Sequence, residues 1–360
     1  MSQKKMCAAG RLFSAALAVL LLLSLNACTN VSETVDDILA ESGSEDTTMS
    51  PESEYDFGED SGVPGFLHYR PAEADDKGGE LTYEYEGGEF SLPYRLTATG
   101  YAKNVGVRLF MDGEPIPFKI NEESAEYEYF HVFDLEKDDE DFDFTFLFTP
   151  HRGKAGDTLS LAAGFVYRPD FQPDMVESSG YGMFHNMPCH TDRFHFNVDA
   201  PAEAAELAEA IPAITAASQE DRVLTSDILA IDWVHGGAID PDELGERVRQ
   251  NLMLNGEEAV SNFKAGDEPV HATLYLCGIP GIVYKTSFYL DHQPICDAQG
   301  NTAFLSTLQK GTVCTMDIEI PAEQIGAGRT FYAISMPCNA EDFPNLPVIH
   351  ERAGSIFIYQ

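Results

Sequence analysis

A cluster of side chains that can bind a metal ion lies between Met183 and Phe196. It combines three histidines, one cysteine and one aspartate: His185, Cys189, His190, Asp192 and His195. A soft divalent ion such as zinc takes imidazole and thiolate ligands together. A loop could therefore wrap His185, Cys189 and His190 around such an ion. These five residues are the candidate metal site of the sequence.

The same segment has a second interpretation, as a polar surface loop that leads into a strand. His195 alternates with Phe194 and Phe196, so a strand would point it away from those two rings. Zinc sites also tend to show tighter paired spacing than this segment does. The surface loop is therefore the favoured interpretation, and the sequence predicts no cofactor.

A group of carboxylates between Asp134 and Asp143 raises the same question for calcium, which prefers oxygen ligands. Counted from Asp134, the sixth and twelfth positions are Asp139 and Thr145, where an EF-hand loop requires glycine and glutamate. We therefore expect a solvated acidic turn here.

Motifs for nucleophilic catalysis are missing from the sequence: it has no Gly-x-Ser-x-Gly, no His-Glu-x-x-His and no glycine-rich phosphate loop before a helix. We therefore expect a protein that is not an enzyme. The leading hypothesis is a binding or scaffold module for a protein, peptide or glycan, with tyrosine and glycine near Ser178–Tyr181 as contact residues. Two alternatives stay open, a divalent-metal-binding surface protein and a glycan-processing enzyme, since the latter needs only two suitably spaced carboxyl groups.

Strands are the elements that must position these residues. Between Asp141 and Thr149, four phenylalanines alternate with other residues: Phe142, Phe144, Phe146 and Phe148. A period of two places the four rings on one face of a strand, and burying each ring contributes about 2 kcal/mol before entropy is subtracted. Leu81, Tyr83 and Tyr85 alternate in the same way before a turn at Gly87 and Gly88.

An internal repeat organises these strands. Asp112-Gly113 follows one apolar run, and Asp291-His292 follows another. Further along, the strand that ends at Pro150 corresponds to one that ends at Pro321, and Gly156 and Gly328 each open a further strand. The order and spacing of the matches predict a duplicated domain. Because His292 replaces Gly113, we expect the second turn to be of another type.

The predicted fold is all-β, with two tandem antiparallel sandwiches whose architecture resembles immunoglobulin-like modules of bacterial surface proteins. The expected sandwiches span residues 66–200 and 222–360, joined by a linker at 201–221. Part of the connection, Ala202–Ala217, is predicted as a short helix or a linker. Residues 241–254 fit either a helix or, from Val248, a strand that turns at Asn255-Gly256.

Five cysteines follow the N-terminal region: Cys189, Cys277, Cys296, Cys314 and Cys338. The last four fall in the second predicted domain and would allow two disulfides in an exported protein. Cys277 and Cys314 lie in apolar strand patterns, so buried free thiols are an equal alternative.

The N-terminus has the pattern of an export signal. Lys4, Lys5 and Arg11 precede an apolar run, and Ala27 precedes Cys28. The segment Leu25-Asn26-Ala27-Cys28 resembles the lipobox of bacterial lipoproteins. This resemblance implies cleavage of the signal peptide, residues 1–27, and attachment of a lipid to Cys28. The protein would then be anchored to the cell membrane on its extracytoplasmic face.

Charge limits the partners of the chain. The sequence has 60 acidic and 22 basic residues, for a net charge of −38. A field of this sign repels phosphate backbones, so nucleic acid is excluded as a partner, whereas a protein or glycan ligand is compatible with it. The residues after the lipobox, 28–65, are acidic and poor in large apolar groups, and we expect a disordered tether there.

Overall fold

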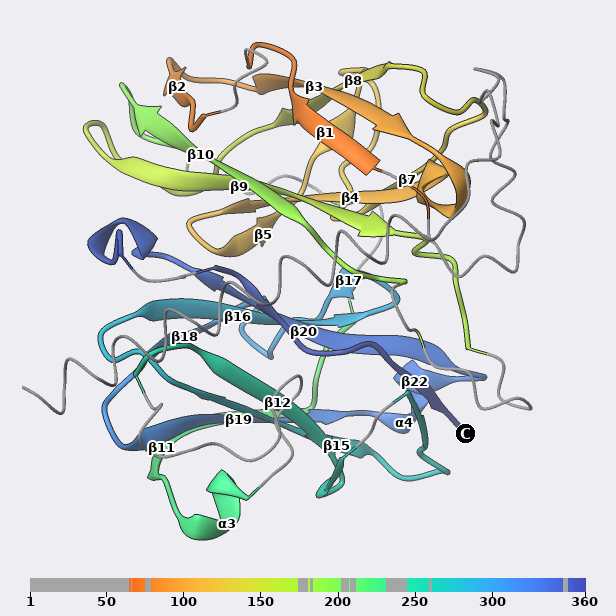
Figure 1. The fold of residues 1–360 in the computed structure, drawn as a ribbon, viewed down its shortest axis with the longest axis vertical. Helices are drawn as coiled ribbons and strands as arrows, with labels where there is room; N and C mark the ends of the chain where they lie inside the picture. Colours follow the sequence, from red (N-terminus) through yellow and green to blue (C-terminus); the bar gives the residue numbers. More distant parts are fainter. Residues whose placement is uncertain are drawn as a thin grey trace, which may run out of the picture. The chain divides into compact units, whose positions relative to one another are not determined.

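The computed structural model describes residues 67–74, 79–173, 184–201, 212–230, 245–258, 261–345 and 349–360, with the single positions Gly65, Tyr181 and Leu207. The predicted signal peptide and almost all of the predicted tether lie outside this part of the chain. The described residues form two β-sandwiches in tandem, which confirms the predicted fold class (Figure 1). No helix among them is long and apolar enough to cross a membrane.

The first sandwich consists of two sheets. One sheet has the strand order β1 (Leu67–Pro71), β3 (Phe90–Ala98), β8 (Phe142–Phe148) and β6 (Lys119–Ile120). The other has the order β2 (Thr82–Tyr85), β10 (Cys189–Phe196), β9 (Thr158–Tyr167), β4 (Asn104–Met111) and β5 (Glu114–Ile116), and β7 (His131–Asp134) also pairs with β4. A short 3-10 helix, η1 (Gly100–Lys103), leads into β4.

The second sandwich also has two sheets. One has the order β11 (Ala216–Val223), β19 (Thr312–Ile320), β15 (Val270–Cys277), β12 (Arg249–Leu254) and β13 (Glu257–Glu258). The other has the order β14 (Asn262–Lys264), β22 (Ile356–Tyr359), β20 (Arg329–Pro337), β16 (Val283–Leu290) and β17 (Gln293–Pro294), with β18 (Phe304–Thr307) on β16 and β21 (Glu351–Arg352) on β20. The helical turns are α3 (Ser226–Leu229), α4 (Ala322–Ile325) and η3 (Ala340–Asp342).

The phenylalanine-rich strand lies in the core of the first sandwich, as predicted. In β8, Phe144, Phe146 and Phe148 are buried and Phe142 is half-buried. The Phe146 ring packs edge-on against Phe118, with ring centroids 5.0 Å apart. Tyr83 and Tyr85 of β2 are buried in the same core, and Gly87 and Gly88 turn the chain with positive φ. Alternation in the sequence thus determines which faces form the core.

The two sandwiches repeat one topology. The order β1-β3-β8 matches β12-β15-β19, and β2-β10-β9-β4-β5 matches β14-β22-β20-β16-β17. Both copies even share one parallel pair, β2 with β10 and β14 with β22, where the sequence predicted antiparallel pairs throughout. The matched turns and strand ends of the sequence therefore belong to equivalent elements.

The two repeated hairpin turns have the same backbone form, and the expectation of different types is wrong. Asp112 and Gly113 have φ of 47° and 78°, and Asp291 and His292 have 45° and 66°. Positive φ at both central residues is what a type I′ turn requires. A histidine adopts this form at a steric cost of about 1 to 3 kcal/mol, which surrounding contacts must offset.

The connection between the sandwiches also differs from its prediction. The strand β11 occupies Ala216–Val223 and pairs with β19, so residues predicted as linker belong to the second sandwich. Most of the predicted helix or linker at Ala202–Ala217 lies outside the described residues. Of the two interpretations of 241–254, the strand is confirmed, because β12 runs from Arg249 to Leu254 and turns at Asn255-Gly256.

All five described cysteines are free thiols. Cys277 and Cys314 are buried in the second sandwich, where they pack as apolar side chains. The structure therefore agrees with the free-thiol alternative and contains no disulfide among the described residues.

Candidate functional site

The five predicted metal-ligating residues lie in four separate environments. His185 is fully buried in the loop before β10, with Nδ1 3.1 Å from the Ser355 hydroxyl. Cys189 begins β10, and its thiol lies 3.9 Å from the Met187 carbonyl oxygen. His195 faces the opposite side of β10 from Phe194 and hydrogen-bonds Thr158.

His190 and Asp192 are the only two of these five residues that contact each other, with 3.0 Å between Nε2 and the carboxylate. Asp192 is buried and also accepts hydrogen bonds from the Leu81 backbone N–H and, at 3.4 Å, from the Tyr83 hydroxyl. These bonds attach β10 to the start of β2. Burial raises the pKa of Tyr83, and the neighbouring Asp192 raises it further. No three His, Cys, Asp or Glu side chains of the described residues are arranged to hold a metal ion, and the metal site stays a prediction.

Three buried polar or charged side chains, Arg108, His185 and His292, lie where the two sandwiches meet. An apolar cluster joins β4 and β9 of the first sandwich to β16 and β20 of the second. Its buried members are Phe110, Phe130, Ala162, Val166, Met187, Tyr289, Tyr332, Ile334 and Met336. We call this cluster, with the polar groups it encloses, the interdomain site.

Arg108 on β4 is the centre of the interdomain site and is only 1% exposed. Its guanidinium carbon lies over three rings, 4.4 Å from the centroid of Tyr289, 4.8 Å from Phe130 and 5.6 Å from Tyr332. Its Nη2 donates a 2.6 Å hydrogen bond to the Tyr332 hydroxyl. No ion pair with a carboxylate is present at Arg108 among the described residues, so ring faces and the Tyr332 oxygen stabilise this buried charge.

The hydrogen bonds of His292 determine which of its nitrogens carries the proton. Nε2 lies 2.9 Å from the Pro169 carbonyl oxygen, which can only accept, so Nε2 is protonated. Nδ1, 2.8 Å from the Tyr332 hydroxyl, must then accept. The Tyr332 hydroxyl in turn accepts from Arg108. These bonds, and stacking of the imidazole on Phe130 at 4.4 Å, hold His292 in its positive-φ turn.

His185 takes part in a second relay of the same kind. Arg352 Nη2 donates to the Ser355 hydroxyl at 2.6 Å, and that hydroxyl can donate to His185 Nδ1 at 3.1 Å. Burial, reinforced by Arg352, lowers the pKa of His185 to about 3. Burial and the neighbouring His185 lower the pKa of His292 well below its usual value. Both imidazoles are therefore neutral acceptors at physiological pH, and they are enclosed rather than open to a substrate.

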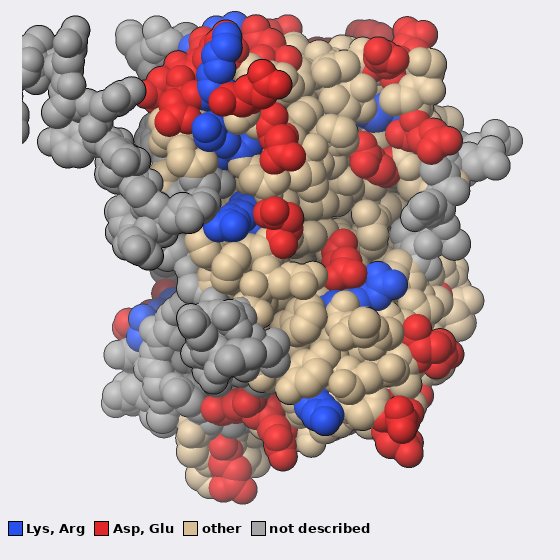
Figure 2. All heavy atoms as spheres, turned by 90° about the vertical axis from the view of Figure 1, so that its right-hand side faces the viewer, with Lys and Arg blue, Asp and Glu red and all other residues tan. Residues whose placement is uncertain are grey.

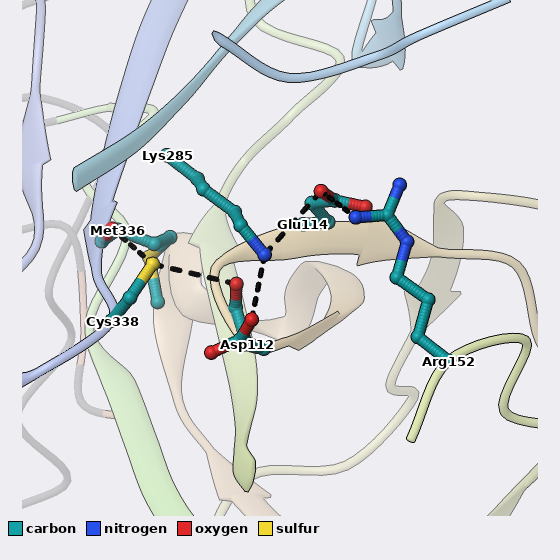
Figure 3. A network of polar contacts seen from close by, with 6 residues as sticks. All are labelled: Asp112, Glu114, Arg152, Lys285, Met336 and Cys338. Carbon is teal, nitrogen blue, oxygen red and sulfur yellow. Dashed lines mark hydrogen bonds and ion pairs between the residues drawn. The ribbon is translucent and has the colours of Figure 1, made fainter. Parts of the chain in front are cut away.

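A network of ion pairs lies at the edge of the interdomain site (Figure 3). Lys285 of β16 reaches into the first sandwich, with Nζ 2.7 Å from Asp112 and 3.4 Å from Glu114. Arg152 pairs with the same carboxylate oxygen of Glu114 as Lys285 does. The Cys338 thiol lies 3.5 Å from the Asp112 carbonyl oxygen, and burial raises the pKa of this thiol to about 12. The Asp112-Gly113 turn of one repeat is thus held by the other repeat.

The predicted acidic turn between β7 and β8 is exposed, as expected. Together with Leu135 and Phe142 it lines a hollow of about 370 Å³. Several of its carboxylates already have partners, among them Asp138 with Lys103 at 2.8 Å and Glu140 with Lys137 at 2.7 Å. Acidic side chains are spread widely over the face shown in Figure 2. The turn therefore contributes to a general negative surface.

Sequence reasoning missed Arg108, His292, Tyr332 and Arg352. One signal was available: Arg108 interrupts the apolar run Val105–Met111, and Lys285 interrupts Ile282–Leu290. A cation inside a buried strand is uncommon unless something pairs with it. Two of the three rings that enclose Arg108, those of Tyr289 and Tyr332, come from the other repeat, and no local pattern of the sequence connects them to Arg108.

No family model matches the chain, and no curated protein matches it. Three solved structures are similar at low identity. A protein of unknown function from Porphyromonas gingivalis W83 is 8% identical, with a TM-score of 0.22, over 83% of this chain and 100% of its own. An ICAM-5 D1-D4 ectodomain fragment is 13% identical, with a TM-score of 0.20, over 82% of this chain and 54% of its own. The chain thus spans about half of that fragment. The C-terminal domain of the Streptococcus agalactiae AgI/II polypeptide BspA is 8% identical, with a TM-score of 0.19, over 82% of this chain and 100% of its own. TM-scores this low place the chain in no family.

We predict that Tyr332→Phe destabilises the protein by about 2 to 3 kcal/mol, because Arg108 and His292 both lose a buried partner. In an Arg108→Met background the loss should be smaller by about 1 to 2 kcal/mol, since the charged donor is gone. Urea unfolding of the original protein, the two single variants and the double variant measures the coupling free energy between Tyr332 and Arg108. Tyr359→Phe, outside the interdomain site, is the control and should cost less than about 0.5 kcal/mol. If the destabilisation by Tyr332→Phe and that by Arg108→Met simply add in the double variant, the hydrogen bond between these two residues is contradicted.

We also predict that acid destabilises the interdomain site through His185. Its pKa is about 3 in the folded protein and about 6.5 when unfolded, so between these values the unfolded chain binds more protons and stability falls as pH falls. At pH 5 the loss is about 2 kcal/mol relative to neutral pH.

The variant His185→Asn should lose less stability than the original protein between pH 7 and pH 5 in urea unfolding. Asn tolerates the φ of 64° at this position and can still bond Ser355. Glu351, whose pKa burial raises to about 7, acts in the opposite direction but equally in both proteins. The same pH dependence in both would refute the role of His185.

Proposed function

We propose that this protein is a lipid-anchored module on the extracytoplasmic face of the cell membrane. Its two sandwiches act together as a non-catalytic binding or scaffold unit for a protein, peptide or glycan. The observation that carries the proposal is the interdomain site. Tandem domains move relative to each other unless their interface is large and apolar. Here nine buried apolar residues and a buried Arg108 join the two sandwiches.

A joined pair of sandwiches presents its loops and sheet edges at fixed separations. Such rigidity favours binding, because less conformational entropy is lost when a partner associates. The buried imidazoles and guanidinium of the interdomain site are enclosed by rings, so their role is to hold the two repeats together. The whole chain has a net charge of −38, which favours partners that are neutral or basic.

The anchoring part of the proposal is supported by the sequence alone. Three basic residues, an apolar run and the Leu25-Asn26-Ala27-Cys28 motif precede the acidic segment 28–65. Two acyl chains on one cysteine hold a protein stably to a bilayer, whereas one chain gives only marginal binding. The acidic segment would then keep the sandwiches away from the membrane surface.

Metabolic labelling with an alkyne analogue of palmitate tests the anchor in full-length protein expressed in a bacterium. We expect label on the original protein, none on Cys28→Ser, and unchanged label on Cys7→Ser, which alters the other N-terminal cysteine. Mass spectrometry should find a mature chain that begins at Cys28. An unlabelled original protein that keeps Met1 and fractionates with the cytosol would refute the anchor.

A further inference from the structure

The strand β11 is the longest strand at a sheet edge among the described elements. Its eight residues, Ala216–Val223, pair without interruption with β19 on one side. On the other side no described strand pairs with it. All eight residues are exposed, so another chain can approach this edge.

The other terminal strands of the sheets are protected from such pairing. Each of them is five residues long or shorter. Three of them contain a proline, at Pro71 in β1, Pro115 in β5 and Pro294 in β17. Short strands and proline are the usual means by which proteins prevent edge-to-edge association. β11 has neither of these protections.

The ladder between β11 and β19 determines which backbone groups face outward. The Leu224 N–H donates to the Gly311 carbonyl oxygen, which makes this a hydrogen-bonded pair of the antiparallel ladder. Bonded and non-bonded pairs alternate along such a ladder. The N–H and C=O groups of every second residue therefore point away from β19: Ala217, Gln219, Asp221 and Val223. These groups form a template for one more strand.

The charge around this edge selects the partner. Glu220 and Asp221 lie on β11, and Asp317 and Glu319 lie on β19, opposite Ser218 and Ala216 of β11. Within β11 the one basic residue, Arg222, is already paired with Glu220 and lies 3.8 Å from Asp317. A second copy of this chain would bring like charges together, which disfavours self-association. An extended segment rich in Lys or Arg would instead be attracted.

We propose that the outer edge of β11 binds an extended, basic polypeptide segment as an added β-strand. Backbone hydrogen bonds to the alternate residues of β11 supply affinity, and the four acids supply preference for positive side chains. This inference rests on the proposed binding role and adds the site and the class of partner.

A fluorescent octapeptide of alternating Val and Lys tests this inference by fluorescence polarisation. The full chain should bind it, with affinity that falls as salt rises, and should not bind the matching Val-Glu peptide. The double variant Ala217→Pro/Val223→Pro should bind about tenfold more weakly, because each proline removes an outward N–H and leaves the β19 ladder intact. The matched control Ala217→Thr/Val223→Thr keeps both N–H groups and should bind normally.

Two further measurements separate strand addition from charge attraction alone. A Val-Lys peptide with N-methyl groups on alternate residues keeps its charge and should not bind. Amide exchange at Gln219 and Asp221 should slow when the unmethylated peptide is present. Equal binding of the methylated peptide, equal binding by the proline variant, or no binding of the Val-Lys peptide would each overturn the inference. Labelling of Cys28 is independent of these results, so the proposed lipid anchor and the proposed peptide binding at β11 can be refuted separately.

Discussion

The burial of Arg108 between the two sandwiches is the interaction on which the rest of this structure depends. Moving an unpaired guanidinium out of water costs several kcal/mol. Three ring faces and one charged hydrogen bond offset that cost, at about 0.5 to 2 kcal/mol per ring and about 1.5 to 3 kcal/mol for the bond. Two of the rings, Tyr289 and Tyr332, belong to the other repeat. The first sandwich alone therefore cannot stabilise the buried charge on its strand β4, and the two repeats stabilise each other.

The interface joins equivalent surfaces of the two repeats. Counted from the matched aspartates Asp112 and Asp291, Phe110 of β4 corresponds to Tyr289 of β16, and both lie in the interdomain cluster. Each hairpin turn also contacts the opposite sandwich, since Asp112 pairs with Lys285 and His292 bonds Pro169. This arrangement is that of a two-fold symmetric dimer in which the subunits share one chain.

The symmetry is broken where charge is placed. The position that holds Arg108 in the first repeat holds Ser287 in the second, and the position of Lys285 is occupied by Gly106. A side chain at Gly106 would collide with the Phe130 ring, whose nearest atom lies 2.0 Å from the Cβ position. Each repeat thus contributes one cation to an aromatic or acidic surface of the other. These differences fit the repeats to each other and explain why their sequences match only at turns and strand ends.

The sequence predicted what depends on local pattern. Alternation identified β8 and β2, and paired turn motifs identified the repeat, because the two faces of a strand and the φ values of a turn are set by neighbouring residues. Prediction failed where residues far apart in the sequence determine the conformation or the environment of a side chain. His292 occupies a positive-φ turn because Tyr332 and Pro169 hold it. His185 resembled a metal ligand in the sequence, and its environment comes from Ser355 and Arg352. The strand β11 was taken for a linker because none of its residues is buried, and only its pairing with β19 reveals it.

The central claim is that the interdomain site makes the two sandwiches one folding unit. Differential scanning calorimetry of the full chain tests it most directly. We predict a single transition whose calorimetric and van't Hoff enthalpies agree, and its separation into two transitions in Arg108→Ala. Two independent transitions in the original protein, unchanged by that substitution, would contradict the claim.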